Sequence, residues 1–342
     1  MSFADEMKTE LAKALQAHVE VPIPADKVPE FHQFEPAEGA RDLVAVDGSY
    51  SFLLNISSWW LALVSVALLR YRFDGEAYHR EDWRLVQRAA GVSTWAEYVE
   101  TQDERLRALY EFTRNASEPH REMVNELRRF IEGEVAANYA TDSRDLIVAV
   151  DGALQEFPKR FEVMEHLVKA CERQGHVLVG VSKDSQLHAF GHVLTDEDFL
   201  KRCESRVGGN GLAYVKAPPS VPVAQKGLLL GDVYYVRFHG RAPKWFRVDV
   251  GTRKDDPDYV FGQVAPYCRS LISIGYPLPL LEAHRMAVTV RQLRGAYQEM
   301  IIRTATGMGM DIRQVLDGLT EMEGRKRGAF HEYLDRVSRG LR

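Results

Sequence analysis

The chain has 342 residues, of which 45% are hydrophobic and 27% charged, and its formal net charge is −5 at pH 7. This composition is typical of a soluble globular protein with one large domain or two small ones. The acidic balance argues against a protein that coats DNA by charge alone. Basic residues gather late in the chain, where eleven Lys and Arg stand against seven Asp and Glu from Arg285 onwards.

Three features of the sequence indicate a cytoplasmic protein without a membrane partner. Its cysteines, Cys171, Cys203 and Cys268, form no C-x-x-C pair, so we expect them to be reduced and structural. The first residues are charged and lack an apolar signal core. The apolar run at residues 59–69 is shorter than the roughly 20 residues that a membrane-spanning helix needs. We therefore predict a buried strand there.

The first 40 residues are predicted to form a separate helix and its connector. Met7, Leu11 and Leu15 lie at helical spacing among charged residues, which predicts an amphipathic helix over residues 1–20. The prolines in residues 21–24 end it. An apolar stripe on an isolated helix must pack on something, so we expect this helix to mediate a homodimer.

The next hundred residues are predicted to hold strands and then helices. A strand is expected at residues 43–47, and residues 49–73 can supply two more before Asp74-Gly75 turns the chain. From about Arg80 to Tyr139 the pattern is helical, and Pro119 divides an earlier helix from a later one.

The middle of the chain reads as a strand, a helix and a strand. Apolar runs at residues 147–151 and 177–184 flank an amphipathic segment at residues 160–171. This order predicts a parallel pair of strands with a right-handed crossover. Residues 185–230 are rich in glycine and proline and are expected to be mostly loop.

The last third is predicted to contain an antiparallel pair of strands and then helices. The strands are expected at residues 233–239 and 245–250, and one long helix is expected from Leu280 through Ile302. Residues 301–342 form a basic helical tail in this interpretation, which leaves residues 41–300 as the main domain.

Two similar runs are the strongest candidates for a functional site. Val44-Ala-Val-Asp47-Gly48 and Val148-Ala-Val-Asp151-Gly152 each attach an aspartate to an apolar strand, where burying an unpaired carboxylate is costly. A third strand leads to Lys183. Together these residues predict an acidic, metal-binding site shared by three strands. The alternative for either run alone is an ordinary Asp-Gly turn, in which the glycine takes a positive φ.

Other common sites are absent from the sequence. There is no Gly-Lys dipeptide for a phosphate-binding loop and no H-E-x-x-H, and Gly180-Val-Ser182 lacks the second glycine of a nucleophile elbow. Carboxylates remain, and their hard oxygens suit Mg²⁺ or Mn²⁺. Two such ions about 4 Å apart can activate water and stabilise the leaving oxygen of a phosphodiester. This is nuclease chemistry.

In order along the chain, these motifs resemble the NurA family of prokaryotic nucleases. The resemblance rests on Val-Asp47-Gly-Ser, a helical glutamate, Val-Asp151-Gly, Gly-Val-Ser-Lys183-Asp-Ser, Tyr276 and Ala-His284, and it spans about residues 40–290. It implies an α/β fold with an RNase H-like mixed sheet, related to PIWI domains. Helices would flank this sheet, with helical insertions and further helices at both termini.

The same resemblance implies an activity and partners. The expected activity is that of a two-metal-ion DNA nuclease using Mn²⁺ or Mg²⁺, with 5′ to 3′ exonuclease activity on single- and double-stranded DNA and endonuclease activity on single strands. The expected partner is a HerA-type hexameric translocase, in DNA end resection and double-strand break repair.

The resemblance also assigns roles to individual residues. Asp47 and Asp151 would bind the metal ions, together with one glutamate from the helix before the second aspartate. Glu132 matches the family's local pattern, Glu134 lies near the apolar stripe of that helix, and Glu126 is a third alternative. Each of these glutamates, taken alone, would also be explained as a solvated helix charge.

Three further residues complete the implied site. Lys183 would face the scissile phosphate, Tyr276 would orient the DNA, and His284 would complete the metal shell or carry a proton. The second motif departs from the family, because Ala153 replaces the serine after Asp-Gly. The competing hypothesis is an RNase H-like or PIWI-like module that binds nucleic acid or docks a partner without cleaving.

Overall fold

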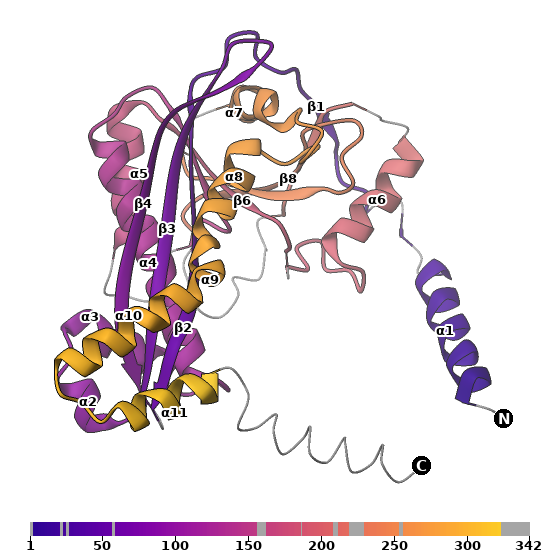
Figure 1. Ribbon diagram of the computed structural model, residues 1–342. Coiled ribbons are helices and arrows are strands. Elements are labelled where there is room, and N and C mark those ends of the chain that lie inside the picture. The colour runs from indigo at the N-terminus through magenta and orange to yellow at the C-terminus, as the bar shows by residue number, and fades with distance from the viewer. Residues whose placement is uncertain are drawn as a thin grey trace.

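A computed structural model of the chain describes residues 3–20, 23–24, 27–56, 59–155, 162–185, 187–207, 211–218, 229–252 and 256–322. Within these ranges a single nine-stranded mixed sheet runs through the molecule, and helices cover both of its faces (Figure 1). The strands are β1 (His32–Gln33), β2 (Leu43–Ile56), β3 (Trp59–Phe73), β4 (Tyr78–Ser93), β5 (Ile147–Asp151), β6 (Val177–Ser182), β7 (Ala213–Lys216), β8 (Asp232–Arg237) and β9 (Phe246–Val250).

The helices divide into those before β5, those between β5 and β7, and those after β9. They are α1 (Phe3–Glu20), α2 (Ala96–Glu100), α3 (Glu104–Thr113), α4 (Pro119–Thr141), α5 (Val163–Gln174), α6 (Asp196–Val207), α7 (Pro257–Val264), α8 (Leu278–Ala287), α9 (Thr289–Gln292), α10 (Arg294–Gly307) and α11 (Ile312–Met322). None of them is both long and apolar enough to cross a bilayer.

The order of the strands confirms the predicted fold class. The sheet runs β1-β7-β8-β9-β6-β5-β2-β3-β4. The strands β2, β3 and β4 form an antiparallel meander, while β5 pairs in parallel with both β2 and β6. This is the RNase H-like arrangement that the family resemblance implied, and the antiparallel strands β9, β8, β7 and β1 extend it on the β6 side.

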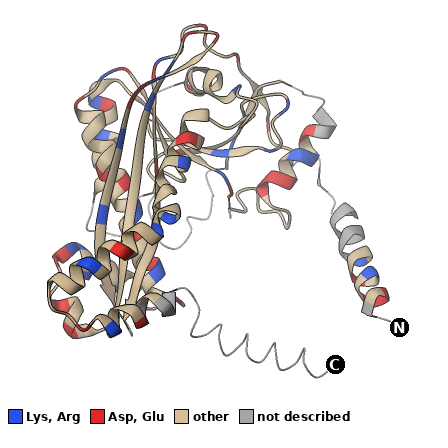
Figure 2. Ribbon diagram, in the orientation of Figure 1, with Lys and Arg blue, Asp and Glu red and all other residues tan. Residues whose placement is uncertain are grey.

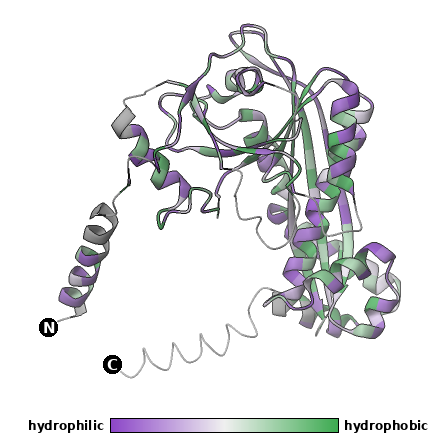
Figure 3. Cartoon of the chain, turned by 180° about the vertical axis from the view of Figure 1, so that it is seen from behind, coloured by the Kyte–Doolittle hydropathy of each residue, from purple (hydrophilic) through white to green (hydrophobic). Residues whose placement is uncertain are grey.

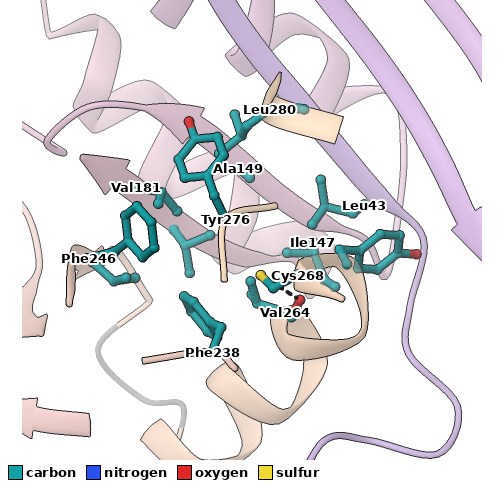
Figure 4. Packing of buried hydrophobic residues seen from close by; sticks show 14 of the residues in the cluster. Leu43, Ile147, Ala149, Val181, Phe238, Phe246, Val264, Cys268, Tyr276 and Leu280 are labelled. Atoms are coloured by element: carbon teal, nitrogen blue, oxygen red, sulfur yellow. Dashed lines mark hydrogen bonds between the residues drawn. The ribbon is translucent and has the colours of Figure 1, made fainter. Parts of the chain in front are cut away.

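Each central strand buries both of its faces, because successive side chains point to opposite sides of a sheet. Leu43 and Ala45 of β2 join the core beneath α7 and α8, part of which is drawn in Figure 4. Val44 and Val46 join the second core, beneath α4 and α5. In Figure 3 hydrophobic residues run along the central strands, while hydrophilic and hydrophobic residues alternate along the helices.

Two predicted boundaries in the first half are wrong. The strand expected to end at Asp47 continues as β2 to Ile56, because β3 pairs with it throughout. The segment from Arg80, expected to be helical, belongs to the edge strand β4. Charged and polar residues dominate its first half, with exposed Trp83 and Leu85 among them, so its sequence lacks the continuous apolar run of a buried strand. Its pairing with β3 overrides that local pattern.

The second half contains two further differences. Residues 185–230, expected to be mostly loop, include α6 and β7. The single helix expected from Leu280 to Ile302 is divided into α8, α9 and α10 at Val288 and Leu293. This break lets Val290 pack on Leu53 and Leu63 of the sheet. The predicted antiparallel pair and the helix starting at Pro119 are both confirmed.

The ends of the chain differ in how they contact the sheet. Helix α11 packs Val315 and Leu319 against Leu54 at the far end of β2. Helix α1 projects from the body in Figure 1 and exposes Met7 and Leu11. Charges of both signs lie along α1 and α6 (Figure 2). The basic cluster at residues 325–327 lies outside the described residues. The three cysteines are buried and unbridged.

Candidate active site

The sheet register brings the two predicted aspartates together. The pairing of β2 with β5 ends at Val46↔Val150, so Asp47 and Asp151 are the next residues on neighbouring strands. Both point to the α8 face. The ammonium of Lys183 lies between them, with Nζ 3.1 Å from Asp151 Oδ2 and 3.6 Å from Asp47 Oδ2. Carboxylates from two segments a hundred residues apart therefore converge on one cation.

The two Asp-Gly pairs have different backbone roles. Gly152 follows the end of β5 with φ near +100°, the left-handed conformation expected of an Asp-Gly turn. Gly48 instead lies inside β2 and faces α4, where an added Cβ would collide with the carboxylate of Glu132. The turn alternative therefore holds for the second pair. At the first pair, glycine makes room for a helix side chain.

The position of Lys183 is fixed through a contact to its backbone carbonyl. It follows β6, which lies parallel to β5, and its side chain is 36% exposed. Lys244 donates hydrogen bonds to the carbonyl oxygen of Lys183 and to the Asp184 carboxylate, the latter at 2.8 Å. The loop after β6 is thereby fixed, so the ammonium is directed at the aspartates while part of the side chain stays open to solvent.

The segment at α8 supplies a separate hydrogen-bond partner for each aspartate. The Tyr276 hydroxyl donates to Asp151 Oδ1 at 2.9 Å, and its ring packs 5.5 Å from that of Phe246 in the core shown in Figure 4. His284 Nδ1 lies 2.9 Å from Asp47 Oδ2. These contacts orient both carboxylates. The structure thus gathers five predicted residues in one place.

The helix α4 brings Glu132, and not Glu134, to this group. Glu132 is buried beside Gly48 and forms an ion pair with Arg128. Glu134 is 38% exposed and lies 3.6 Å from Arg105 of α3, in a groove shared with α5. Glu126 is bonded to Arg129 at 3.1 Å. Of the alternatives left open by the sequence, Glu132 is the one that the fold directs toward the aspartates.

Burial and like charges raise the proton affinity of the acidic group. Burial, together with the charges of Asp47 and Asp151, raises the pKa of Glu132 to about 7, and Arg128 opposes this shift. Burial and Asp47 also raise the pKa of Asp151, against the hydrogen bonds from Lys183 and Tyr276. Three carboxylates are therefore crowded into a poorly solvated space that favours added positive charge.

Arg128 is the participant that the sequence analysis missed. Its guanidinium donates to Glu132 and to Asn125 Oδ1, the latter at 3.1 and 3.3 Å. The spacing of Arg128 and Glu132 at i and i+4 on one helix was the available signal. Because such pairs usually lie on solvated surfaces, the spacing alone did not single this one out.

Matches at the level of the sequence are lacking, since no family model and no curated protein matches the chain. Among solved structures, the NurA nuclease from Sulfolobus solfataricus has a TM-score of 0.51 at 14% identity, covering 87% of this chain and 95% of that one. A second NurA structure has a TM-score of 0.52 at 9% identity, covering 92% and 100%. The chain has the fold of the NurA nucleases.

Within this NurA-type fold, the donor set fits a divalent metal ion in its chemistry. Asp47 and Asp151 offer hard oxygen donors, and His284 offers an imidazole beside them. The buried Oγ of Ser49 has no hydrogen-bond partner within the described residues, so it is available to a water molecule near Asp47. Across those residues, no three His, Cys, Asp or Glu side chains form a ready-made metal cage. The protein's own cations hold the carboxylates instead.

Proposed function

We propose that this protein is a DNA nuclease that uses Mn²⁺ or Mg²⁺ to hydrolyse phosphodiester bonds. The observation that carries the proposal is the convergence of Asp47 and Asp151 on Lys183 in the middle of the sheet, where β5 ends beside the longer β2. Carboxylates brought together on neighbouring central strands are costly to bury, so such a group marks a candidate ligand site. The fold shared with NurA structures supports the same activity.

In this proposal the acidic residues hold the metal ions. Asp47 and Asp151 bind the metal from two strands, and Glu132 approaches from α4. Bound divalent ions supply an activated water and stabilise the leaving oxygen. His284 keeps the Asp47 carboxylate oriented and lies close enough to act as a ligand or to carry a proton. Tyr276 fixes the other carboxylate through its hydroxyl.

Lys183 acts on the substrate side of the site. Because the Lys183 side chain is partly exposed, its rotation is enough to bring the ammonium from the carboxylates to a phosphate oxygen. A cation there offsets charge that develops on the phosphate in the transition state. Lys244 contributes by keeping the loop of Lys183 in place.

The test is cleavage of end-labelled single- and double-stranded DNA by the purified full chain. We expect products with Mn²⁺ or Mg²⁺ and none with EDTA, and addition of excess Mn²⁺ to the EDTA sample should restore them. Undiminished cleavage in EDTA would contradict the metal assignment. Separate 5′ and 3′ labels determine polarity, for which we propose 5′ to 3′ exonuclease activity with some endonuclease activity on single strands.

We further propose that the protein works beside a HerA-type hexameric translocase in DNA end resection and double-strand break repair. The sequence has no Gly-Lys dipeptide for a phosphate-binding loop, which fits a nuclease that relies on a separate motor for translocation. If the partnership exists, adding a HerA-type ATPase with ATP will lengthen the resected tract. An unchanged tract would contradict it.

A homodimer through α1 is the last part of this proposal. Met7 and Leu11 lie one helical turn apart, and both are more than half exposed. Apolar side chains in this arrangement favour packing against a second helix. Light scattering of the full chain should give twice the monomer mass, and deletion of residues 1–20 should halve it. An equal mass before and after deletion would contradict the interface.

A second candidate function is a nucleic-acid-binding or partner-docking module that does not cleave. It is favoured by one observation, that Lys183 and Arg128 already pair with the carboxylates. Such a module would bind labelled DNA equally well with Mn²⁺ or EDTA and would release no products. The nuclease binds and cleaves, so one titration combined with one gel separates the two.

A further inference from the structure

Arg128 occupies an unusual position for an arginine on a helix. Its side chain is only 19% exposed, that of its partner Glu132 is 7% exposed, and Asn125 accepts two further hydrogen bonds from it. An added Cβ on Gly48 would lie 3.0 Å from its Cγ, so β2 approaches the stem of the side chain closely. The guanidinium is therefore built into the wall of the acidic site.

The charges of the site explain why this position matters. When all are ionised, Asp47, Asp151 and Glu132 supply three negative charges, against which Lys183 and Arg128 supply two positive ones. Such a site attracts a divalent ion weakly while both cations remain in place. The affinity for metal must rise if either cation moves away from its carboxylate, because Coulomb attraction at these distances is large.

A nucleic acid offers the Arg128 guanidinium an alternative partner. Phosphates are the preferred partners of arginine, whose planar guanidinium binds two of their oxygens at once. Arg128 and Glu132 lie one turn apart on α4, so rotation of the arginine side chain alone exchanges its partner. Asn125, one turn before Arg128, keeps the guanidinium near the site during that exchange.

We propose that Arg128 is an internal counter-ion for Glu132 that a DNA phosphate draws away, freeing the glutamate for a divalent ion. DNA and metal then bind cooperatively. The inference rests on the proposed nuclease function and adds its regulation: the site loads metal when substrate arrives. Because coupling between two ligands is reciprocal, metal tightens DNA binding by the same factor.

The experiment is calorimetric titration of Mn²⁺ into the full chain, with and without a single-stranded phosphorothioate oligonucleotide whose integrity is checked on a gel. In the wild-type protein we expect the oligonucleotide to tighten Mn²⁺ binding by about tenfold or more. In Arg128→Met, Mn²⁺ binds more tightly than in the wild type before DNA is added, and DNA adds less than about threefold.

Arg121→Met is the control on the same helix. Arg121 lies about two turns before Arg128 on α4 and is paired with Glu118 at 3.3 Å rather than with Glu132. It should keep the wild-type affinity and coupling. Fluorescence anisotropy of the same oligonucleotide, in Mn²⁺ and in EDTA, checks the reciprocal effect on DNA affinity in all three proteins.

The outcomes separate this inference from the function on which it rests. Equal Mn²⁺ affinity and equal DNA coupling in wild type and Arg128→Met would overturn the counter-ion role while leaving the nuclease intact. No Mn²⁺ binding by the wild type under either condition would contradict both. If circular dichroism shows that Arg128→Met does not fold, Arg128→Lys replaces it. Its single, less well-directed ammonium should give an intermediate Mn²⁺ affinity, and an unchanged affinity would overturn the inference.

Discussion

The two Val-Ala-Val-Asp-Gly segments share their sequence pattern and differ in their surroundings. After Asp151 the chain leaves the sheet through Gly152, whose φ is positive. After Asp47 the chain continues as a strand for nine more residues, to Ile56, because β3 pairs with it along the whole length. The same sequence motif therefore ends strand β5 but lies inside strand β2.

This difference creates the site. The parallel partner β5 stops at Asp151, whereas β2 continues, so beyond Val46 one edge of β2 is no longer paired with β5. The side chains of Lys183 and Glu132 gather at that step in the sheet. A short strand beside a long one therefore provides both the aspartates and the space for their partners.

Removing either carboxylate should have the largest effect. We expect Asp47→Asn and Asp151→Asn each to reduce Mn²⁺-dependent cleavage by about 10³-fold, roughly 4 kcal/mol, because each loses a charged oxygen donor. Initial rates on a labelled oligonucleotide measure this. Asp232→Asn is the control, since that residue lies on β8 and pairs with Lys216 of β7. A loss below tenfold in either aspartate variant would break the claim that both strands serve one site.

The raised pKa of Glu132 predicts how stability depends on pH in EDTA. Its pKa is about 7 in the folded protein and 4.5 ordinarily, so between these values the folded state binds the proton and the unfolded state does not. Stability therefore falls as pH rises through this window, by an amount on the order of 3 kcal/mol.

Urea unfolding at pH 5 and pH 8 measures this contribution. Glu132→Gln should lose less stability than the wild type between the two pH values, because it has no proton to release. Glu134→Gln, on the opposite side of α4, should behave as the wild type. The same pH dependence in Glu132→Gln and wild type would show that Glu132 is not held in a buried acidic group.

Substituting Gly48 and Gly152 compares the two Asp-Gly pairs directly. Gly48→Ala forces Glu132 aside, and we expect a stability loss of about 1–3 kcal/mol and a loss of cleavage near 100-fold. Gly152→Ala meets no neighbouring atom and pays only for its backbone conformation, about 1–2 kcal/mol, with at most about a tenfold loss of cleavage. If Gly152→Ala proved the more harmful to cleavage, the interpretation of Gly48 would be wrong.

Tyr276→Phe should have the smallest effect. It removes the hydrogen bond to Asp151 while keeping the ring that packs in the core, so we expect about a tenfold lower cleavage rate and little change in unfolding temperature. Tyr297→Phe, which loses a hydrogen bond to Gln87 instead, controls for hydroxyl removal. Equal rates for the two variants would leave Tyr276 without a role in orienting the carboxylate.

Much of the central fold was predictable because its signals are local. The apolar runs that lead to Asp47, Asp151 and Lys183 mark buried strands, and Pro119 marks the start of α4. The edge strand β4 was not predictable in this way. Its stability comes from pairing with β3, and charged residues interrupt its few apolar ones, so its own sequence resembles a solvated helix.

The choice between Glu132 and Glu134 shows what a single sequence does not contain. Helical periodicity placed Glu134 near the apolar stripe of α4, yet that side of the helix meets Arg105. Glu132 reaches the site because Gly48, on a strand more than eighty residues earlier, has no side chain to block it. Only the packing of helix on sheet connects these two positions.

The central claim is that Asp47 and Asp151 share a divalent ion, and anomalous diffraction from crystals soaked in Mn²⁺ tests it most directly. The account predicts an anomalous peak between the two carboxylates, about 2.0–2.4 Å from an oxygen of each, with the Lys183 ammonium moved from its present place. Lys183 still bridging both aspartates at saturating Mn²⁺, with no peak beside them, would contradict it.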